Sequence, residues 1–287
     1  MLIKHVVELF HKYLEALDRS PETIRGYTVE LACWMRFLEK THNGQVYLDE
    51  VTPADVEAYV IHMKDQGQAP GSRSRFVYIV KSFYNFCYKK DLVERNLGAK
   101  LEAVPIPQKE RSYLTPDELD ELFKAIEHPL IQLVVITLSY TGLRISECLH
   151  LTLSDVDLTN KSILARNTKG KRDRRIPIHQ DLLPKLKEYK DVWRDSSKSD
   201  IFFATQKTGK LSPIYVNRII HETVAKLGWT KTGISCHSMR HSFATNLIKN
   251  KQSIVLVQKL LGHAKLATTG IYTHADMEDL AEAVNAL

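Results

Sequence analysis

The sequence predicts a mainly helical protein of two domains, the second of which also contains a small antiparallel sheet. Three observations support this prediction. Apolar residues recur at helical spacing through the first hundred positions, a segment with two prolines and mixed charges follows at 104–111, and two short apolar runs enclose a basic turn within 161–178. A chain of 287 residues is also long for one compact core and comfortable for two domains.

The first domain, residues 1–103, should consist of four helices and shows no strand pattern. Its first helix follows from apolar and charged residues that alternate at helical spacing near the N-terminus. The other three should begin at Pro21, Pro53 and Pro70, because proline is favoured in the first turn, where its missing N–H breaks no helical bond. The expected helices cover residues 3–17, 21–40, 53–66 and 70–90.

Residues 104–111, VPIPQKER, are the expected linker. Proline donates no backbone hydrogen bond and disfavours helix at the residue before it, so two prolines in this segment interrupt regular structure. Thr115 and Glu118 then form a capping-box pattern, with Thr at the cap and an acidic residue three positions later. The second domain is therefore expected to span 112–287.

The second domain should begin with helices at 119–126 and 130–139 and then change character. SILARNT and RIPI, on either side of KGKRDR, are typical of two short strands around a basic turn, and a further strand, IFFAT, is expected from Ile201. Helices should resume at Pro213 and continue nearly to the C-terminus. There, residues 275–287 place apolar side chains at helical spacing, which predicts a short amphipathic helix.

The net charge of +6 lies wholly in the second part of the chain. Residues 1–103 contain 14 Lys and Arg and 14 Asp and Glu, whereas residues 104–287 contain 26 and 20. Such an excess suggests an anionic partner, of which nucleic acid is the commonest. Many soluble enzymes carry a similar charge, so the excess alone does not identify the partner.

Composition disfavours secreted, membrane-spanning and zinc-ribbon proteins. The four cysteines are scattered and form no C-x-x-C pair, which argues against a disulfide framework and against a zinc ribbon. The longest strongly apolar stretch, residues 130–139, is too short to cross a bilayer, and residues 1–17 lack the pattern of a signal peptide. We therefore expect a cytoplasmic protein without a membrane partner.

Four short segments of the second domain carry candidate chemistry. Taken singly, each has an ordinary explanation: a solvated arginine, a charged turn, a packing tyrosine. His237 and His241 have the i, i+4 spacing of a helical zinc pair, but the Glu expected between such ligands and a third ligand are not evident. The segments are TGLRISECL with Arg144, NTKGKRDRRIP with Lys169, HSMRHSFAT with His237 and Arg240, and LGHAKLATTGIYTH with His263 and Tyr272.

In this order and at this spacing, the four segments resemble the active-site motifs of the tyrosine recombinase (phage integrase) family. In that family two Arg, a Lys, two His and a Tyr form one site, and all six positions are filled here. Glu147 also occupies the acidic position that often follows the first Arg by three residues. The resemblance covers the second domain closely, and the four-helix first domain is similar in kind to the family's SAM-like core-binding domain. The catalytic residues that it implies are Arg144, Lys169, His237, Arg240, His263 and Tyr272.

The chemistry of phosphodiester cleavage suits these residue types. Negative charge grows on the non-bridging oxygens in the transition state, and preorganised cations stabilise it. Arg144 and Arg240 suit this task because a guanidinium forms paired hydrogen bonds to phosphate and keeps its proton. The histidines can bind the same oxygens and help remove the proton of Tyr272, whose hydroxyl is a weak nucleophile at its free pKa of about 10.

The resemblance implies a 3′-phosphotyrosyl intermediate, which keeps the phosphodiester energy so that resealing needs no ATP. Lys169, at the tip of the predicted hairpin, would give a proton to the departing 5′-oxygen. No cofactor and no metal are expected, because the arginines stabilise the charge that metals stabilise in many nucleases.

Further contacts to double-stranded DNA are expected outside the catalytic set. The turn between the two predicted strands is rich in Lys and Arg and has one acidic residue, so it should lie against phosphates, although a solvated charged turn is the ordinary alternative. Two arginines near the start of the fourth helix are candidate backbone or groove contacts. The expected DNA-binding residues are Lys171, Arg172, Arg174, Arg73 and Arg75.

The resemblance also implies an assembly on DNA with a specific recombination site. Relatives pass a C-terminal helix to a neighbouring subunit in a cyclic tetramer, and residues 276–287 are expected to do so here, within a homo-tetramer or a hetero-tetramer with a paralogue; docking on their own domain is the alternative. The compact chain favours an Xer-type role in dimer resolution, with a transposon- or phage-encoded resolvase or integrase as the runner-up. A type IB topoisomerase, a non-catalytic DNA-binding regulator and a metal-dependent nuclease fit less well.

Overall fold

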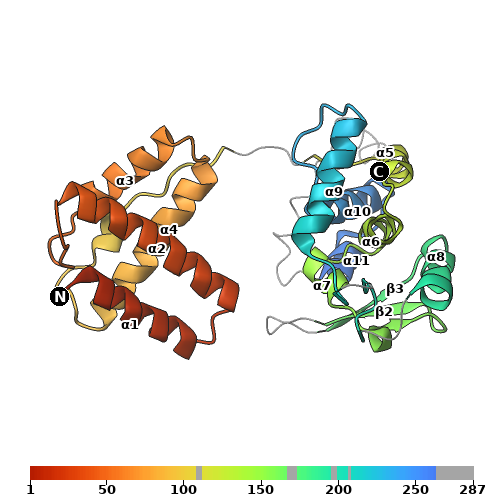
Figure 1. Cartoon of the computed structure of the whole chain (residues 1–287), viewed down its shortest axis with the longest axis horizontal. Coiled ribbons are helices and arrows are strands. Elements are labelled where there is room, and N and C mark those ends of the chain that lie inside the picture. The colour runs from red at the N-terminus through yellow and green to blue at the C-terminus, as the bar shows by residue number, and fades with distance from the viewer. Residues whose placement is uncertain (108–111, 167–172, 195–198, 206–207, 263–287) are drawn as a thin grey trace, which may run out of the picture. The chain divides into compact units, whose positions relative to one another are not determined.

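A computed structural model describes residues 1–107, 112–166, 173–194, 199–205 and 208–262 of the chain (Figure 1). The chain forms two compact units, Met1–Lys109 and Glu110–Leu287. Each unit has its own core of buried apolar side chains. Within the described ranges, no helix combines the length and the apolar character needed to cross a membrane.

The first unit is built from the four predicted helices. Ser20 accepts a hydrogen bond from the backbone N–H of Thr23, and Thr52 and Asp55 cap the third helix reciprocally. These caps satisfy backbone donors that a helix cannot satisfy itself, so both helices begin where the Ser-Pro and Thr-Pro pairs predict. The elements are α1 (Ile3–Ala16), α2 (Pro21–Thr41), α3 (Pro53–Asp65), α4 (Pro70–Lys89) and the short 3-10 helix η1 (Leu97–Lys100).

Aromatic side chains fill the centre of this unit. Phe83 of α4 meets Phe10 of α1 edge-on, with ring centroids 5.5 Å apart, and Phe76 of α4 meets Trp34 of α2 at 5.8 Å. Edge-to-face ring pairs stabilise a core beyond the area that they bury. Helix α4 is therefore the central helix against which α1 and α2 pack.

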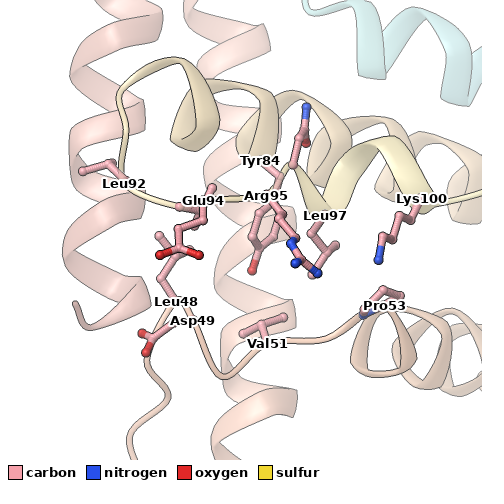
Figure 2. A pocket seen from close by; sticks show the side chains of 12 residues that line it. Leu48, Asp49, Val51, Pro53, Tyr84, Leu92, Glu94, Arg95, Leu97 and Lys100 are labelled. Carbon is pink, nitrogen blue, oxygen red and sulfur yellow. The ribbon is translucent and has the colours of Figure 1, made fainter.

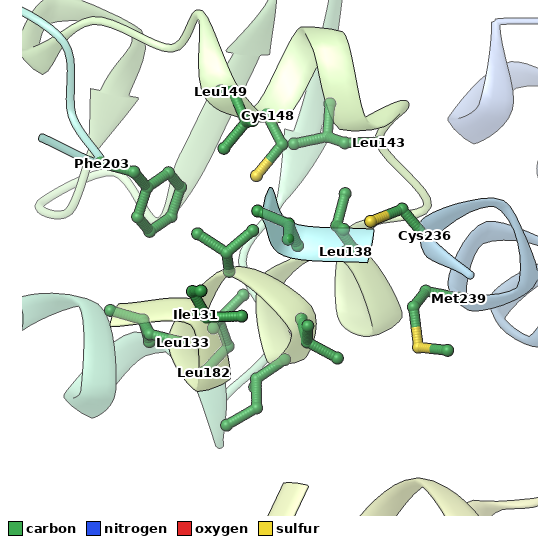
Figure 3. Packing of buried hydrophobic residues seen from close by; sticks show 14 of the residues in the cluster. Ile131, Leu133, Leu138, Leu143, Cys148, Leu149, Leu182, Phe203, Cys236 and Met239 are labelled. Atoms are coloured by element: carbon green, nitrogen blue, oxygen red, sulfur yellow. The ribbon is translucent and has the colours of Figure 1, made fainter. Parts of the chain in front are cut away.

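The second unit is organised around α6, which is apolar on nearly every side. A helix with this composition is stable only when it is buried all round. Figure 3 shows Ile131 and Leu138 of α6 among side chains from other elements, including Cys148 of α7 and Met239 of α10. The helices are α5 (Pro116–Ala125), α6 (Pro129–Thr141), α7 (Ile145–Leu149), α8 (Leu182–Glu188), α9 (Pro213–Lys226), α10 (Cys236–Lys249) and α11 (Ile254–Leu261), with the 3-10 helix η2 (Leu153–Asp155) and the π-helical turn η3 (Tyr189–Trp193).

The two predicted strands are present and pair antiparallel. β2 (Ser162–Ala165) pairs with β3 (Arg174–Pro177) so that Ile163 stands opposite Ile176, and both side chains are buried. A third strand, β1 (Val156–Asp157), which the sequence did not predict, pairs with the other edge of β2. The order β1-β2-β3 therefore forms the small antiparallel sheet of an otherwise helical unit.

The prediction of a strand that begins at Ile201 is wrong. Ile201 forms a single isolated bridge, and Phe202 and Phe203 continue as irregular chain with both rings almost fully buried. The guanidinium of Arg194 donates hydrogen bonds to three carbonyl oxygens of this segment. Both rings pack around Tyr189, and these contacts, with the hydrogen bonds from Arg194, hold the segment in an irregular conformation.

Candidate active site

The candidate site begins at the turn between α6 and α7. Gly142 ends α6 in the left-handed conformation (φ 62°), and a Cβ at this position would collide with the ring of Phe243 on α10. Glycine is the residue that permits both the turn and this close approach. Two residues later, Arg144 is the N-cap of α7, so it stands at the start of a helix as predicted.

Arg144 and Glu147 hold each other in place. Nη1 of Arg144 lies 2.6 Å from Oε1 of Glu147, and the backbone N–H of Arg144 donates to Oε2 at 2.8 Å. The carboxylate thereby caps the first turn of its own helix and orients the guanidinium. The Arg144 side chain stays 32% exposed, so it is also within reach of a ligand from solvent.

Arg174, at the start of β3, pairs with the same carboxylate. Its Nη2 lies 2.8 Å from Oε2 of Glu147 and its Nη1 3.1 Å from Oε1, while its Nε donates to the carbonyl oxygen of Leu260 at 2.8 Å. We expected Arg174 to contact DNA phosphates from the hairpin surface. In the structure its side chain is 9% exposed, and its guanidinium is bound to Glu147 and to the Leu260 carbonyl.

Glu147 is ionised under all ordinary conditions. Burial by itself raises the pKa of its carboxyl group, but the hydrogen bonds from Arg174 and Arg144 and the positive charge of Arg174 outweigh burial and hold the pKa at about 2. A buried carboxylate with both oxygens bound to guanidinium groups is a fixed negative charge. It therefore fixes the positions of the arginines around it.

Arg240, on α10, connects the beginning and the end of the site. It is 5% exposed, and its Nη1 lies 4.0 Å from Oε2 of Glu147. Nη1 also donates to the carbonyl oxygen of Gly142, and Nη2 donates to the carbonyl oxygen of Leu261 at 2.6 Å. The guanidinium thus joins the α6–α7 turn to the end of α11, two places that lie far apart in the sequence.

His237 and His241 lie on α10 with different surroundings. His237 is exposed in the first turn of the helix, one turn before Arg240. His241 is buried, and its ring meets that of Tyr113 edge-on at 6.5 Å. In the part of the chain that the structure describes, no group of three His, Cys, Asp or Glu side chains could hold a metal ion. The two histidines therefore do not share a solvent-facing pair of the zinc-binding kind.

Several predicted residues lie outside the described residues. They fall in the turn between β2 and β3 and in the segment after α11, so the structure positions only the elements that lead to them. The turn is bounded by two paired strands, and α11 ends at Gly262 in the left-handed conformation (φ 66°). The residues concerned are Lys169, Lys171, Arg172, His263, Tyr272 and the segment 276–287.

Arg73 and Arg75 belong to the first unit, in the first turns of α4. Arg75 is exposed, whereas Arg73 is half-buried. Helix α2 comes so close to Arg75 that a Cβ at Gly26 would collide with its guanidinium. Both arginines stay candidate DNA contacts of this unit.

The first unit also contains a pocket, which none of the predicted site residues line. It has a volume of about 410 Å³ and lies between the segment before α3 and the segment after α4 (Figure 2). Leu48, Val51, Arg95 and Lys100 are among its lining residues, together with Tyr84, whose buried hydroxyl has no hydrogen-bond partner within the described residues. Burial raises the pKa of Tyr84, so the phenol stays neutral.

The sequence did not predict the inward role of Arg174 or the part played by the last turn of α11. A signal for Arg174 was available: along a strand, alternate residues share a face, so Arg174 lies on the same face as the buried Ile176 and opposite the exposed Arg175. The carbonyl groups of Leu260 and Leu261 left no such signal. Backbone acceptors are the same at every residue, and only the fold selects them.

Two family models match the chain. The model of the phage integrase family matches residues 112–279, and the model of the phage integrase N-terminal SAM-like domain matches residues 7–91. Together they account for most of both units.

Curated relatives match over nearly the whole length. The tyrosine recombinase XerA of Pyrococcus furiosus is 33% identical over 99% of this chain and 94% of its own, and XerC of Lacticaseibacillus casei is 32% identical over 96% and 95%. The crystal structure of a XerA recombinase superposes with a TM-score of 0.55 at 28% identity, covering 98% of both chains. A lambda integrase dimer bound to a core site reaches 0.80 at 19% identity over 95% of each chain, which shows a common fold.

Proposed function

The chain belongs to the phage integrase family, and from this membership we propose that it is an Xer-type site-specific recombinase that cuts and rejoins double-stranded DNA through a 3′-phosphotyrosyl intermediate and a Holliday junction. One observation carries the proposal: the four motif segments converge. Arg240 of the third motif binds Gly142 of the first and Leu261 of the fourth, and Arg174 of the second binds Glu147 of the first.

The two arginines have geometry suited to one phosphate. The guanidinium of Arg240 is a planar fork of N–H donors, and its bonds to the carbonyl oxygens of Gly142 and Leu261 fix its orientation. Arg144 is partly exposed beside it, and both are oriented by the fixed charge of Glu147. We propose that they bind the scissile phosphate and stabilise its transition state, since preorganised donors cost no rearrangement during the reaction.

The remaining roles follow the motifs. Tyr272 is the proposed nucleophile, and His237 and His263 bind the phosphate oxygens and help remove the tyrosine proton. Lys169 gives a proton to the leaving 5′-oxygen. Neither a metal nor a cofactor has a part in the proposed mechanism.

The organisation along the chain is proposed in the same way. Residues 1–103 form the core-binding domain, with Arg73 and Arg75 as DNA contacts, and 104–111 form the linker. Residues 112–287 form the catalytic domain, where Lys171 and Arg172 contact DNA beside Lys169. A tetramer on two DNA sites, homomeric or with a paralogue, is the proposed assembly, with exchange of residues 276–287, and the cytoplasm is the proposed location.

The Xer-type role is preferred to that of a mobile-element integrase. Relatives named XerA and XerC match almost the full chain at 32–33% identity. The transposon Tn1549 integrase shares the fold, with a TM-score of 0.78, but only 19% of residues, so this likeness carries no argument about role.

The proposal is tested by trapping the covalent intermediate. The full chain is incubated with a nicked half-site DNA in the presence of a metal chelator and run on a denaturing gel. Wild type should give a slower-migrating protein–DNA band, and Tyr272→Phe should not. Tyr47→Phe, an exposed tyrosine of the first unit, is the matched control and should give the band. A Tyr272→Phe band equal to that of wild type would exclude Tyr272 as the nucleophile, and no band from wild type on any site would leave a DNA-binding regulator.

A further inference from the structure

Arg174 joins three elements of the second unit through one side chain. From β3 it forms a two-pronged ion pair with Glu147 of α7 and a hydrogen bond to the Leu260 carbonyl of α11. All three contacts lie within 3.1 Å, and the side chain is 9% exposed. The partners that the structure shows for this guanidinium are thus groups of the protein itself.

The turn after Leu260 is shaped to fit this side chain. Gly262 ends α11 with φ 66°, and a Cβ at this position would lie 3.0 Å from Cδ of Arg174 and 3.2 Å from its Nη1. Any larger residue at 262 would press on the arginine in addition to straining the backbone. The glycine of the L-G-H motif thus makes room for Arg174, and the next residue along the chain is His263.

Charge gives Arg174 a second effect. Glu147 is 8% exposed and touches Arg144 and Arg174, with Arg240 at 4.0 Å. A buried carboxylate needs its full set of donors. Without Arg174, Glu147 would attract Arg144 and Arg240 more strongly, because they are its remaining cationic neighbours among the described residues. These are the two arginines that the proposed mechanism assigns to phosphate.

We propose that Arg174 is a positioning residue for DNA cleavage, which holds the end of α11 and the charge of Glu147 in place beside Arg144 and Arg240. The inference rests on the proposed function. It assigns Arg174 no contact with DNA. A displacement of about 1 Å at reacting groups can cost about a hundredfold in rate, so a residue that acts only through its neighbours can have a large effect.

The test compares Arg174→Gln and Arg174→Lys with wild type on the nicked half-site. Two quantities are measured: the rate of covalent complex formation at saturating DNA, and the Kd for the half-site over a range of salt concentrations. We expect Arg174→Gln to lower the rate about tenfold or more, while Kd and its salt dependence stay near wild type. Arg174→Lys should stay well below the wild-type rate, because one ammonium cannot bind both carboxylate oxygens and Leu260 together. Arg175→Gln, which removes the same charge from the exposed face of β3, is the control and should match wild type.

A glycine pair supplies a test that leaves Arg174 intact. Gly262 and Gly228 both have φ 66°, but a Cβ at Gly228 meets nothing within 4 Å. Gly262→Ala should slow cleavage at saturating DNA, whereas Gly228→Ala, which adds the same backbone strain without touching Arg174, should not. Equal rates for the two alanine variants would overturn the proposal.

The pH dependence separates positioning from a general loss of structure. Arg174 keeps Glu147 ionised, so cleavage by Arg174→Gln should be lost at a higher pH than cleavage by wild type when the pH is lowered. Thermal unfolding at pH 7 shows whether the variant is folded. An unchanged rate and acid limb in Arg174→Gln would contradict the proposal. A phosphate contact would give a different result: weaker binding of the half-site, a dependence of log Kd on log salt concentration that is smaller by about one, and a wild-type rate of cleavage. That result would also contradict the proposal. Loss of the band in wild type as well would instead count against the proposed function.

Discussion

Arg240 and Leu261 are joined by a hydrogen bond of 2.6 Å from the arginine Nη2 to the leucine carbonyl oxygen. The same guanidinium binds the carbonyl of Gly142, 98 residues earlier in the chain. Arg240 therefore joins the turn between α6 and α7 to the last turn of α11, so that these two parts of the chain are held together. A preorganised site of this kind avoids rearrangement during the reaction.

Arg240→Lys should destabilise the chain even though it keeps the charge. One ammonium cannot reach both carbonyls in the geometry of the guanidinium fork, and a buried acceptor left unpaired costs about 1–3 kcal/mol. The free energy of unfolding, from urea titration, should fall by this order, and the covalent band should weaken. Arg218→Lys, on the exposed surface of α9, is the control and should change stability by less than about 0.5 kcal/mol. Equal stability of the two variants would contradict the structural role of Arg240.

Glu147→Gln should change how stability depends on acid. The pKa of Glu147 is held at about 2 in the folded chain, below its ordinary value of 4.5. The stabilisation from the ionised carboxylate is therefore fully present above about pH 4.5 and is lost as the pH falls toward 2. The difference in unfolding free energy between wild type and Glu147→Gln should be constant near neutrality and shrink across this window. A difference that stays the same down to pH 2 would show that the carboxylate is not ionised by its arginine partners.

Features encoded by neighbouring residues were predictable from the sequence. The helix starts at Ser20 and Thr115 follow from caps whose donor and acceptor lie three residues apart, and the structure has both. Arg144 was placed correctly at a helix start from the Thr-Gly turn before it, and in the structure Gly142 ends one helix and Glu147 caps the next. Local chemistry decides these positions, whatever the rest of the chain does.

Features that depend on distant partners were not predictable. β1 has two residues and exists because β2 offers it an edge, so its own pattern carries no signal. The apolar run at Phe202 forms a buried loop because Arg194 and Tyr189 surround it. The alternation along β3 indicated that Arg174 faces inward with Ile176, but its partner Glu147, 27 residues away in the sequence, was not predictable. Tertiary contacts decided all three.

Ser242→Ala should remove a hydrogen bond that holds the backbone at Leu114, near the start of the second unit. The N–H of Leu114, a fully buried residue, donates to Oγ of Ser242 at 2.8 Å, and Nδ2 of Asn246 donates to the Leu114 carbonyl at 3.2 Å. Removing the hydroxyl leaves a buried N–H unpaired, which costs about 1–3 kcal/mol. Amide hydrogen exchange at Leu114 should therefore become about tenfold faster or more, since about 1.4 kcal/mol is a factor of ten.

Asn246→Ala is the matched control for this contact. It removes the hydrogen bond to the carbonyl of Leu114 but keeps Ser242, which accepts from the N–H of Leu114. Amide exchange at Leu114 should therefore change much less than in Ser242→Ala. Both serine and asparagine lie on α10, the helix of His237 and Arg240, so the start of the unit is attached directly to a helix of the site. Unchanged exchange in Ser242→Ala would mean that the bond does not protect this amide.

Deleting residues 276–287 should separate the recombination of two sites from the binding of one. Their apolar side chains recur at helical spacing, so burial of this apolar face against a protein surface would be favourable in free energy. The second unit offers a cleft of about 260 Å³ between α5, α6 and α10, lined by Leu119, Phe123, Phe243 and Leu247 among others. If one subunit places its tail in the cleft of the next, the deleted chain should lose recombination of two sites while it binds a single site within about twofold of wild type.

Leu247→Asp alters the cleft and leaves the tail intact, so it distinguishes exchange from a local effect of truncation. A charged group at the cleft would have to be buried under an apolar helix, which is costly without a partner. Leu247→Asp and the deletion should therefore have the same phenotype, and the two together should be no worse than either alone, because both remove one contact.

Mixing the two single variants adds a stricter condition. In the mixture, Leu247→Asp has an intact tail and the deleted chain has an intact cleft. A complete interface therefore forms only where a Leu247→Asp subunit gives its tail to a deleted subunit, which in a cyclic tetramer is at most every second interface. Native gels with two DNA sites should show partial synapsis for the mixture and none for either variant alone. Full recombination by the deleted chain would refute tail exchange.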